Sequence, residues 1–111
     1  MSKYLFQLSY SDAGQQQILK GGGTSLQKTI EATVRSLNGW MEAFYFSFGE
    51  TDIFVIAELP DNVSAATFSL VVSSAGAGRI KTTVLISSAE IDLVTKKTIN
   101  FQNPGTISPP G

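Results

Sequence analysis

The sequence predicts one α+β domain of the ferredoxin-like βαββαβ type, a four-stranded antiparallel sheet with both long helices on one face. Three observations predict this fold. Strand and helix patterns follow one another in the order strand, helix, two strands, helix, strand. Right-handed crossovers on that order place both helices on the same side of the sheet. The 111 residues suffice for one hydrophobic core and are too few for two.

The first strand is predicted over residues 4–10, where every second side chain is apolar or aromatic, as in a strand with one buried face. These alternating residues are Tyr4, Phe6, Leu8 and Tyr10. Ser11 and Asp12 then supply an N-cap for a short helical stretch over residues 15–20. The three glycines at 21–23 break this stretch and predict a flexible joint.

The best-defined helix is predicted to begin at Thr24, whose side chain forms a capping box with Gln27. Its apolar side chains recur on one helical face, at Leu26, Ile30, Val34 and Leu37. Asn38 and Gly39 end the helix, because both tolerate the left-handed backbone conformation that commonly terminates helices.

Two strands are predicted over residues 40–48 and 53–57, and the tight connection 49–52 joins them into an antiparallel hairpin. Both strands are mostly apolar on two faces. In the first of them, one side is expected to carry Phe44, Phe46 and Phe48, and the other Met41, Ala43 and Tyr45. Pro60 ends the hairpin.

A second helix is predicted after Pro60, with Asp61, Asn62 and Ser64 as candidate caps. Its apolar residues recur at helical spacing, at Ala65, Phe68, Val71, Val72 and Ala75. Gly76 stops this helix.

The fourth strand is predicted over residues 80–86, and a capping box of Ser87 and Glu90 begins a last short helix that reaches about Lys97. The domain is expected to span residues 1–101. Residues 102–111 carry three of the four prolines and are predicted to be a loose tail.

The hairpin strands are apolar on both faces, which predicts a partner that covers the face without helices. Two helices cover one face of the sheet, whereas Met41, Ala43, Tyr45 and alternate residues of 53–57 are expected on the other. A second copy of the same sheet is the simplest cover, which predicts a homodimer or higher homo-oligomer. The alternative is that the last helix folds over this face.

The composition excludes several kinds of chemistry. The formal net charge of -1 offers no electrostatic footprint for nucleic acid. Without Cys there are no disulfides or thiolates, and without His the commonest metal ligand and general base are missing. No cofactor and no metal are therefore predicted. No stretch is apolar and long enough for secretion or a membrane span, so a cytoplasmic location is predicted, with no membrane partner.

Four segments together resemble a known family: residues 3–7, 42–49, 59–62 and 79–83. They are similar to the GYD domain family over about residues 3–97. Gly49 and Asp52 match the naming motif, while Thr51 stands at the position of its tyrosine. The family is grouped with the dimeric α+β barrel proteins, so the resemblance implies a dimer. It implies no particular reaction, because related barrel families include cofactor-free oxygenases, isomerases and haem-degrading enzymes.

Polar side chains expected near the seam between sheet and helices form the candidate pocket, namely Tyr10, Arg35, Tyr45, Asp52 and Lys81. Each phenol can orient a ligand, although an aromatic core role is the commoner interpretation. Asp52 is expected to cap its own turn unless it pairs with Arg35 or Lys81 in a cleft. Arg35 can simply snorkel, and Lys81 with Arg79 can hold an anion or discourage strand pairing.

Three functions remain open. The first is a homo-oligomeric module that binds a small apolar or weakly anionic molecule in the seam. The second is a cofactor-independent enzyme of oxygenase or isomerase type, in which a tyrosine positions the substrate and Asp52 moves a proton. The third is a self-associating structural protein, with a seam filled by Phe44, Phe46 and Phe68.

Overall fold

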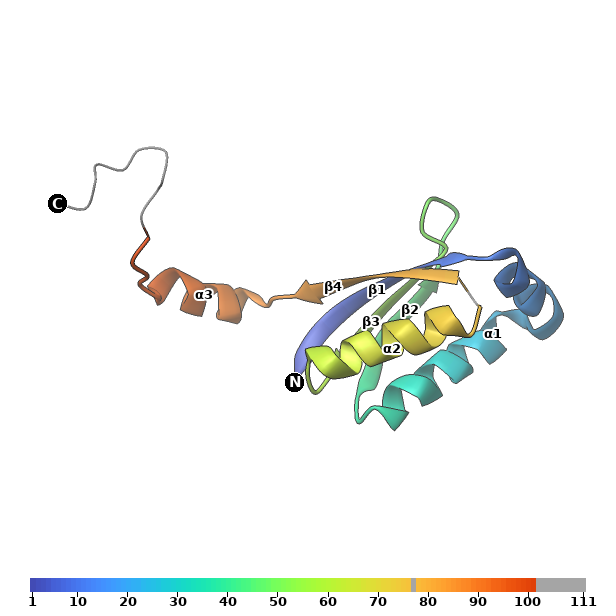
Figure 1. Ribbon diagram of the computed structural model, residues 1–111, viewed down its shortest axis with the longest axis horizontal. Coiled ribbons are helices and arrows are strands. Elements are labelled where there is room, and N and C mark those ends of the chain that lie inside the picture. Colours follow the sequence, from blue (N-terminus) through green and yellow to red (C-terminus); the bar gives the residue numbers. More distant parts are fainter. Residues whose placement is uncertain (77, 102–111) are drawn as a thin grey trace.

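The computed structural model describes residues 1–76 and 78–101, which form four strands and three helices (Figure 1). In chain order these are β1 (Ser2–Tyr10), α1 (Asp12–Ser36), β2 (Trp40–Phe46), β3 (Ile53–Leu59), α2 (Asn62–Ser74), β4 (Gly78–Leu85) and α3 (Ser88–Lys96). The predicted order of elements is therefore confirmed. The predicted tail at 102–111 lies outside the described residues.

The sheet has the strand order β2-β3-β1-β4, and all three neighbouring pairs are antiparallel. Helices α1 and α2 both lie against one face, and the opposite face carries neither of them (Figure 1). The two crossovers through α1 and α2 are what separate β1 from β2 and β3 from β4 in the sheet. This is the predicted ferredoxin-like arrangement.

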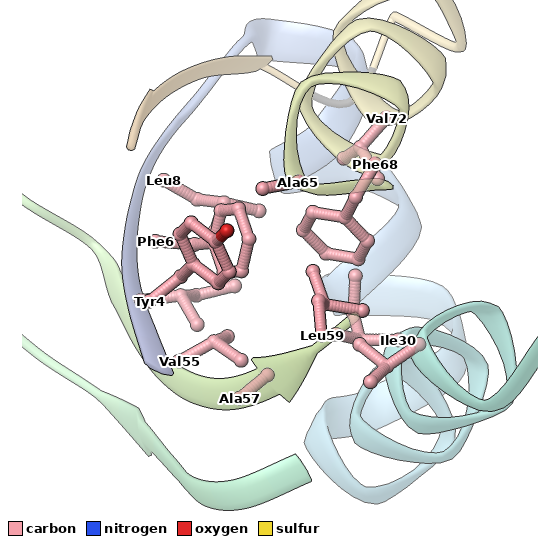
Figure 2. Packing of buried hydrophobic residues seen from close by; sticks show 12 residues of the cluster. Tyr4, Phe6, Leu8, Ile30, Val55, Ala57, Leu59, Ala65, Phe68 and Val72 are labelled. Carbon is pink, nitrogen blue, oxygen red and sulfur yellow. The ribbon is translucent and has the colours of Figure 1, made fainter. Parts of the chain in front are cut away.

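The core lies between the sheet and these two helices. Side chains from β1, β3, α1 and α2 converge there (Figure 2). The rings of Phe6 and Phe68 meet at the centre with a centroid separation of 4.5 Å, and both side chains are fully buried. Among the described residues no polar or charged residue is buried in this core, apart from the phenol of Tyr4. The Tyr4 hydroxyl donates to Oδ1 of Asn62 at 2.7 Å, which satisfies it.

Helix α1 is broken at Gly22, as the glycine run predicts. Gly22 has φ 78° and ψ 171°, a conformation that glycine adopts without steric cost. The prediction that Thr24 caps the second segment is wrong, because the helix resumes directly after Gly22 and Thr24 lies inside it. Gly23 sits against the ring of Phe46, where an added Cβ would come within 2.9 Å of the ring.

The other helix ends follow the sequence closely. Asn38 adopts φ 62° after α1, and the amides of Asn38 and Gly39 donate to carbonyls of the last turn. Of the three cap candidates for α2, Asp61 is the N-cap, and its carboxylate accepts from the Ser64 amide at 2.8 Å. Hydrogen bonding from Ser64 also holds the pKa of Asp61 below its usual value.

Strand β2 departs from the predicted alternation. A β-bulge between Met41 and Ala43 shifts the register, so Met41 pairs with Ala57 and packs on the core. The expectation that Met41 shares a face with Ala43 and Tyr45 is therefore wrong. Strand β2 also ends at Phe46, and Phe48 lies beyond it with a fully exposed side chain.

Helix α3 projects away from the domain at the end of β4 (Figure 1). The described chain extends 68 Å along its longest axis and 27 Å along the next, largely because of this projection. None of the residues of α3 is buried. The alternative in which the last helix covers the open side of the sheet is therefore wrong for this structure.

Candidate functional site

The side of the sheet that faces away from α1 and α2 is called here the open face. The strand register assigns its residues, because partners across neighbouring strands project to the same side. They are Trp40, Ala43 and Tyr45 of β2, Phe54, Ile56 and Glu58 of β3, Lys3, Leu5, Gln7 and Ser9 of β1, and Arg79, Lys81, Thr83 and Leu85 of β4. The open face is thus apolar over β2 and β3 and polar toward β4.

The apolar half is substantially exposed. Tyr45 keeps 69% of its surface accessible and Trp40 keeps 50%. Phe54 and Ile56 lie between them and the β1 residue Leu5, and both are only partly buried. At one end, Lys3 donates to Glu42 at 3.0 Å across the intervening strand β3, an exposed ion pair. An apolar patch of this kind marks an interaction surface more often than a solvated one.

The polar half contains a hollow of about 410 Å³, called here the polar hollow. It is lined by Gln7 and Ser9 of β1, Arg79, Ile80 and Lys81 of β4, and Glu50 and Thr51 of the connection between β2 and β3. The two cations lie two residues apart on β4 and therefore project to the same side. Such a pair beside hydroxyl and amide donors can hold an anion.

The connection 47–52 is tied to the rim of the polar hollow by side chains of β1. The amide nitrogen Nε2 of Gln7 donates to Oγ1 of Thr51 at 3.2 Å, and the Ser9 hydroxyl donates to the Glu50 carbonyl at 3.0 Å. Thr51 therefore serves as a hydrogen-bond acceptor at the polar hollow.

Asp52 and Tyr10 are brought together, but through the backbone of Tyr10. Oδ2 of Asp52 accepts from the Tyr10 amide at 2.7 Å, and the Asp52 amide donates to the Leu8 carbonyl at 2.8 Å. Asp52 thereby fastens the hairpin connection to the end of β1. Burial, and secondarily the nearby Asp52 carboxylate, raises the pKa of the Tyr10 phenol above its usual value. This geometry gives Asp52 a structural role.

Replacing Asp52 with alanine is expected to lower the free energy of unfolding by about 1–3 kcal/mol, because the Tyr10 amide loses a charged acceptor. Asp52→Asn keeps an oxygen acceptor at the same place and should recover most of the loss. Urea denaturation followed by circular dichroism measures both variants. Glu50→Ala, two residues away on the same connection, is the control and should stay within about 0.5 kcal/mol. An Asp52→Ala variant as stable as the control would contradict the structural role.

The remaining candidate residues do not join this pair. Arg35 is exposed in the last turn of α1, next to the carboxyl end of β3, whereas Asp52 precedes the amino end of that strand. Tyr45 lies on the apolar half of the open face and Lys81 in the polar hollow. The five candidates therefore do not form one pocket within a single chain.

The seam between sheet and helices is nearly full. Next to the kink of α1 a cavity of only about 20 Å³ remains, bordered by Leu8, Tyr10, Ile18, Leu26 and Val72 among others. That volume holds about one water molecule. Phe68 fills the centre of the seam, while Phe44 and Phe46 pack against each other at its edge with ring centroids 5.2 Å apart. The polar hollow of the open face, with about 410 Å³, is far larger than this cavity.

The residues that sequence reasoning missed are Gln7, Ser9 and Thr51. The alternation of β1 already put Gln7 and Ser9 opposite its apolar side, but only the pairing register brings them beside Arg79 and Lys81. Gln7 is paired with Lys81, and Ser9 with Arg79. Thr51 joins them through the hairpin connection, a contact over 44 residues of sequence.

The strand order and the position of the helices define a ferredoxin-like α+β domain. The chain belongs to the GYD domain family, whose family model matches residues 4–94. A comparison with curated proteins found no match. Within residues 1–76 and 78–101, no cluster of three acidic side chains suited to a metal ion occurs, and no helix is long and apolar enough to cross a membrane.

Proposed function

We propose that the protein is a homo-oligomeric binding module, in which the open faces of two copies pack together and enclose a small, weakly anionic molecule. One observation carries this proposal: the described residues, 1–76 and 78–101, leave the apolar half of the open face uncovered, with α1 and α2 on the other side and α3 pointing away. Each large side chain that this packing buries contributes about 1.5–3 kcal/mol. Five or six of them together match the whole stability of a typical domain, about 5–15 kcal/mol.

The residues of the apolar half suit an interface. Trp40 and Tyr45 belong to residue types that are enriched among the side chains that dominate binding energy, and both are half exposed or more. A twofold arrangement is the commonest for a chain that binds itself, because the same patch then serves both copies.

The polar hollow adjoins this patch. When a second sheet covers the apolar half, the hollow loses part of its contact with water, and its cations act in a medium of lower dielectric constant. Arg79 and Lys81 favour an anion, whereas Glu50 on the same rim offsets part of their charge. The balance fits a monocarboxylate or a similar weak anion better than a polyphosphate.

Native mass spectrometry of freshly purified protein tests the proposal, because it counts subunits and detects a retained ligand in one experiment. The expected species has at least twice the 11.9 kDa mass of the chain and carries a small molecule. A monomer would contradict the whole proposal. An oligomer that binds no small anion would instead support the self-associating structural protein, which the nearly full seam favours.

Removing both cations of the polar hollow, by Arg79→Ala with Lys81→Ala, is expected to weaken binding of monocarboxylates about tenfold or more while leaving the oligomer intact. Titration calorimetry against a panel of aliphatic and aromatic monocarboxylates measures the loss, and light scattering checks the assembly. Lys20→Ala with Lys28→Ala, two exposed lysines of α1, is the matched control and should bind as the unmodified chain does. If both double variants lost affinity for monocarboxylates equally, the polar hollow would not be the anion-binding site.

A further inference from the structure

Helix α3 has the side chains of a packed helix, but none of its residues is buried against the rest of the described chain. Ile91, Leu93 and Val94 leave 45%, 63% and 59% of their surfaces accessible. The helix has nine residues, and isolated helices shorter than about 12–15 residues are marginal in water. Ile91 and Val94 are three positions apart and therefore lie on neighbouring parts of one helical surface.

A capping box stabilises the first turn of α3. The Ser87 hydroxyl accepts from the Glu90 amide at 3.1 Å, while the Ser87 amide donates to the Glu90 carboxylate at 3.0 Å. These hydrogen bonds lower the pKa of Glu90 and keep it ionised near the positive end of the helix. Capping fixes the first turn alone, so the apolar residues of the later turns still need a partner surface.

An uncharged groove that suits the apolar side chains of α3 lies between α2 and β4, called here the α2–β4 groove. It has a volume of about 480 Å³ and is lined by Tyr4, Asn62, Ala65, Ala66, Ser69, Leu70, Thr82 and Val84. None of these side chains is charged. Leu70 is 71% exposed and Val84 51% exposed, so apolar surface is available at its rim. The groove is on the helix side of the sheet, beside the edge strand β4, and therefore stays open when two open faces pack together.

The link between β4 and α3 directs the helix away from its own groove. Strand β4 ends at Leu85, so only Ile86 and the N-cap Ser87 intervene. Ser87 is extended, with φ -73° and ψ 162°, and α3 continues outward from the end of β4 (Figure 1). To reach its own α2–β4 groove the chain would have to reverse within these two residues, where the capping box already fixes Ser87.

We infer that α3 of one copy docks in the α2–β4 groove of a second copy, with Ile91 and Val94 against Leu70 and Val84. In a twofold dimer both helices do this, so the exchange is reciprocal and closes on itself. The inference rests on the proposed homo-oligomer and extends it: the sheets supply one contact and the exchanged helices a second. The occupant of the groove is a second copy of this chain.

Because the chain has no cysteine, introduced thiols report this contact cleanly. Leu70→Cys and Ile91→Cys are prepared as separate full-length variants, mixed, unfolded and refolded together, and treated with a short bismaleimide. The Ile91→Cys variant is labelled uniformly with a heavy nitrogen isotope, because leucine and isoleucine have equal masses and the unlabelled variants could not be told apart. The expected product is a covalent pair of one chain of each variant, resolved by mass spectrometry through this label. It should exceed, at least about tenfold, the product from Leu19→Cys mixed with Ile91→Cys, since Leu19 is as exposed as Leu70 but lies on α1.

A yield no higher than that of the Leu19 control would overturn the inference. So would crosslinking within one chain of a Leu70→Cys, Ile91→Cys double variant in place of crosslinking between chains, since that places α3 in its own groove. Light scattering on the unmodified chain separates the two proposals. If the unmodified chain is a dimer but the crosslink does not form, only the exchange of α3 is ruled out. If the chain is a monomer, both the open-face assembly and the exchange are ruled out.

Discussion

Replacing Phe68 with alanine is expected to lower the free energy of unfolding by about 3–5 kcal/mol. The ring is fully buried between α2 and the sheet and lies 4.5 Å from the ring of Phe6, so its removal leaves a cavity in the centre of the core (Figure 2). That loss is a large part of the stability of a typical domain, about 5–15 kcal/mol. Urea denaturation monitored by circular dichroism measures it.

Leu70→Ala is the control for this variant, two positions along the same helix with 71% of its surface exposed. Its cost should be within about 0.5 kcal/mol for the separated chain, because little apolar surface is lost. A Phe68→Ala variant with a similarly small cost would mean that the core is not centred on the Phe6–Phe68 pair.

The substitution Ile56→Lys is expected to convert the proposed oligomer into a monomer without unfolding the domain. Ile56 lies on the open face between Ala43 and Leu5, so a lysine there can reach water in the free chain but would be buried without a partner in the assembly. Removing one such contact and adding an unpaired charge costs several kcal/mol of association energy, which corresponds to a rise of about a thousandfold or more in the dissociation constant.

Multi-angle light scattering over a dilution series measures this change, and circular dichroism verifies that the fold is kept. Leu19→Lys introduces the same charge on exposed surface of α1, outside the open face, and should leave the oligomer unchanged. If Ile56→Lys assembles as tightly as Leu19→Lys, the contact between copies lies elsewhere on the molecule.

The fold was largely predictable because local chemistry and tertiary structure agree. The alternation in β1, the glycine break in α1 and the Ser87 capping box all appear where the sequence predicts them. The error in β2 has a definite origin. A pattern of period two assumes one residue per pairing position, and the bulge at Glu42 adds one, which moves Met41 into the core.

The candidate site was less predictable than the fold. Tyr10 and Asp52 were both predicted to line a pocket, but the structure joins them through the Tyr10 amide, which any residue type supplies, and not through the phenol. The polar hollow depends on the register between β1 and β4, and register follows from the whole sheet. The direction of α3 depends on the backbone angles of one linking residue, for which the composition of the segment contains little information.

The bulge in β2 also decides which face its neighbours occupy. It gives Trp40 to the outer surface and Met41 to the interior, two neighbours that would change places if every residue were kept and the strand paired regularly without the bulge. The indole would then have to fit where a flexible thioether now packs, and a methionine would stand where Trp40 is exposed. Relatives with the same number of residues here should therefore keep the bulge, whereas a relative that lacks the residue at Glu42 should pair regularly and keep both side chains on their present faces.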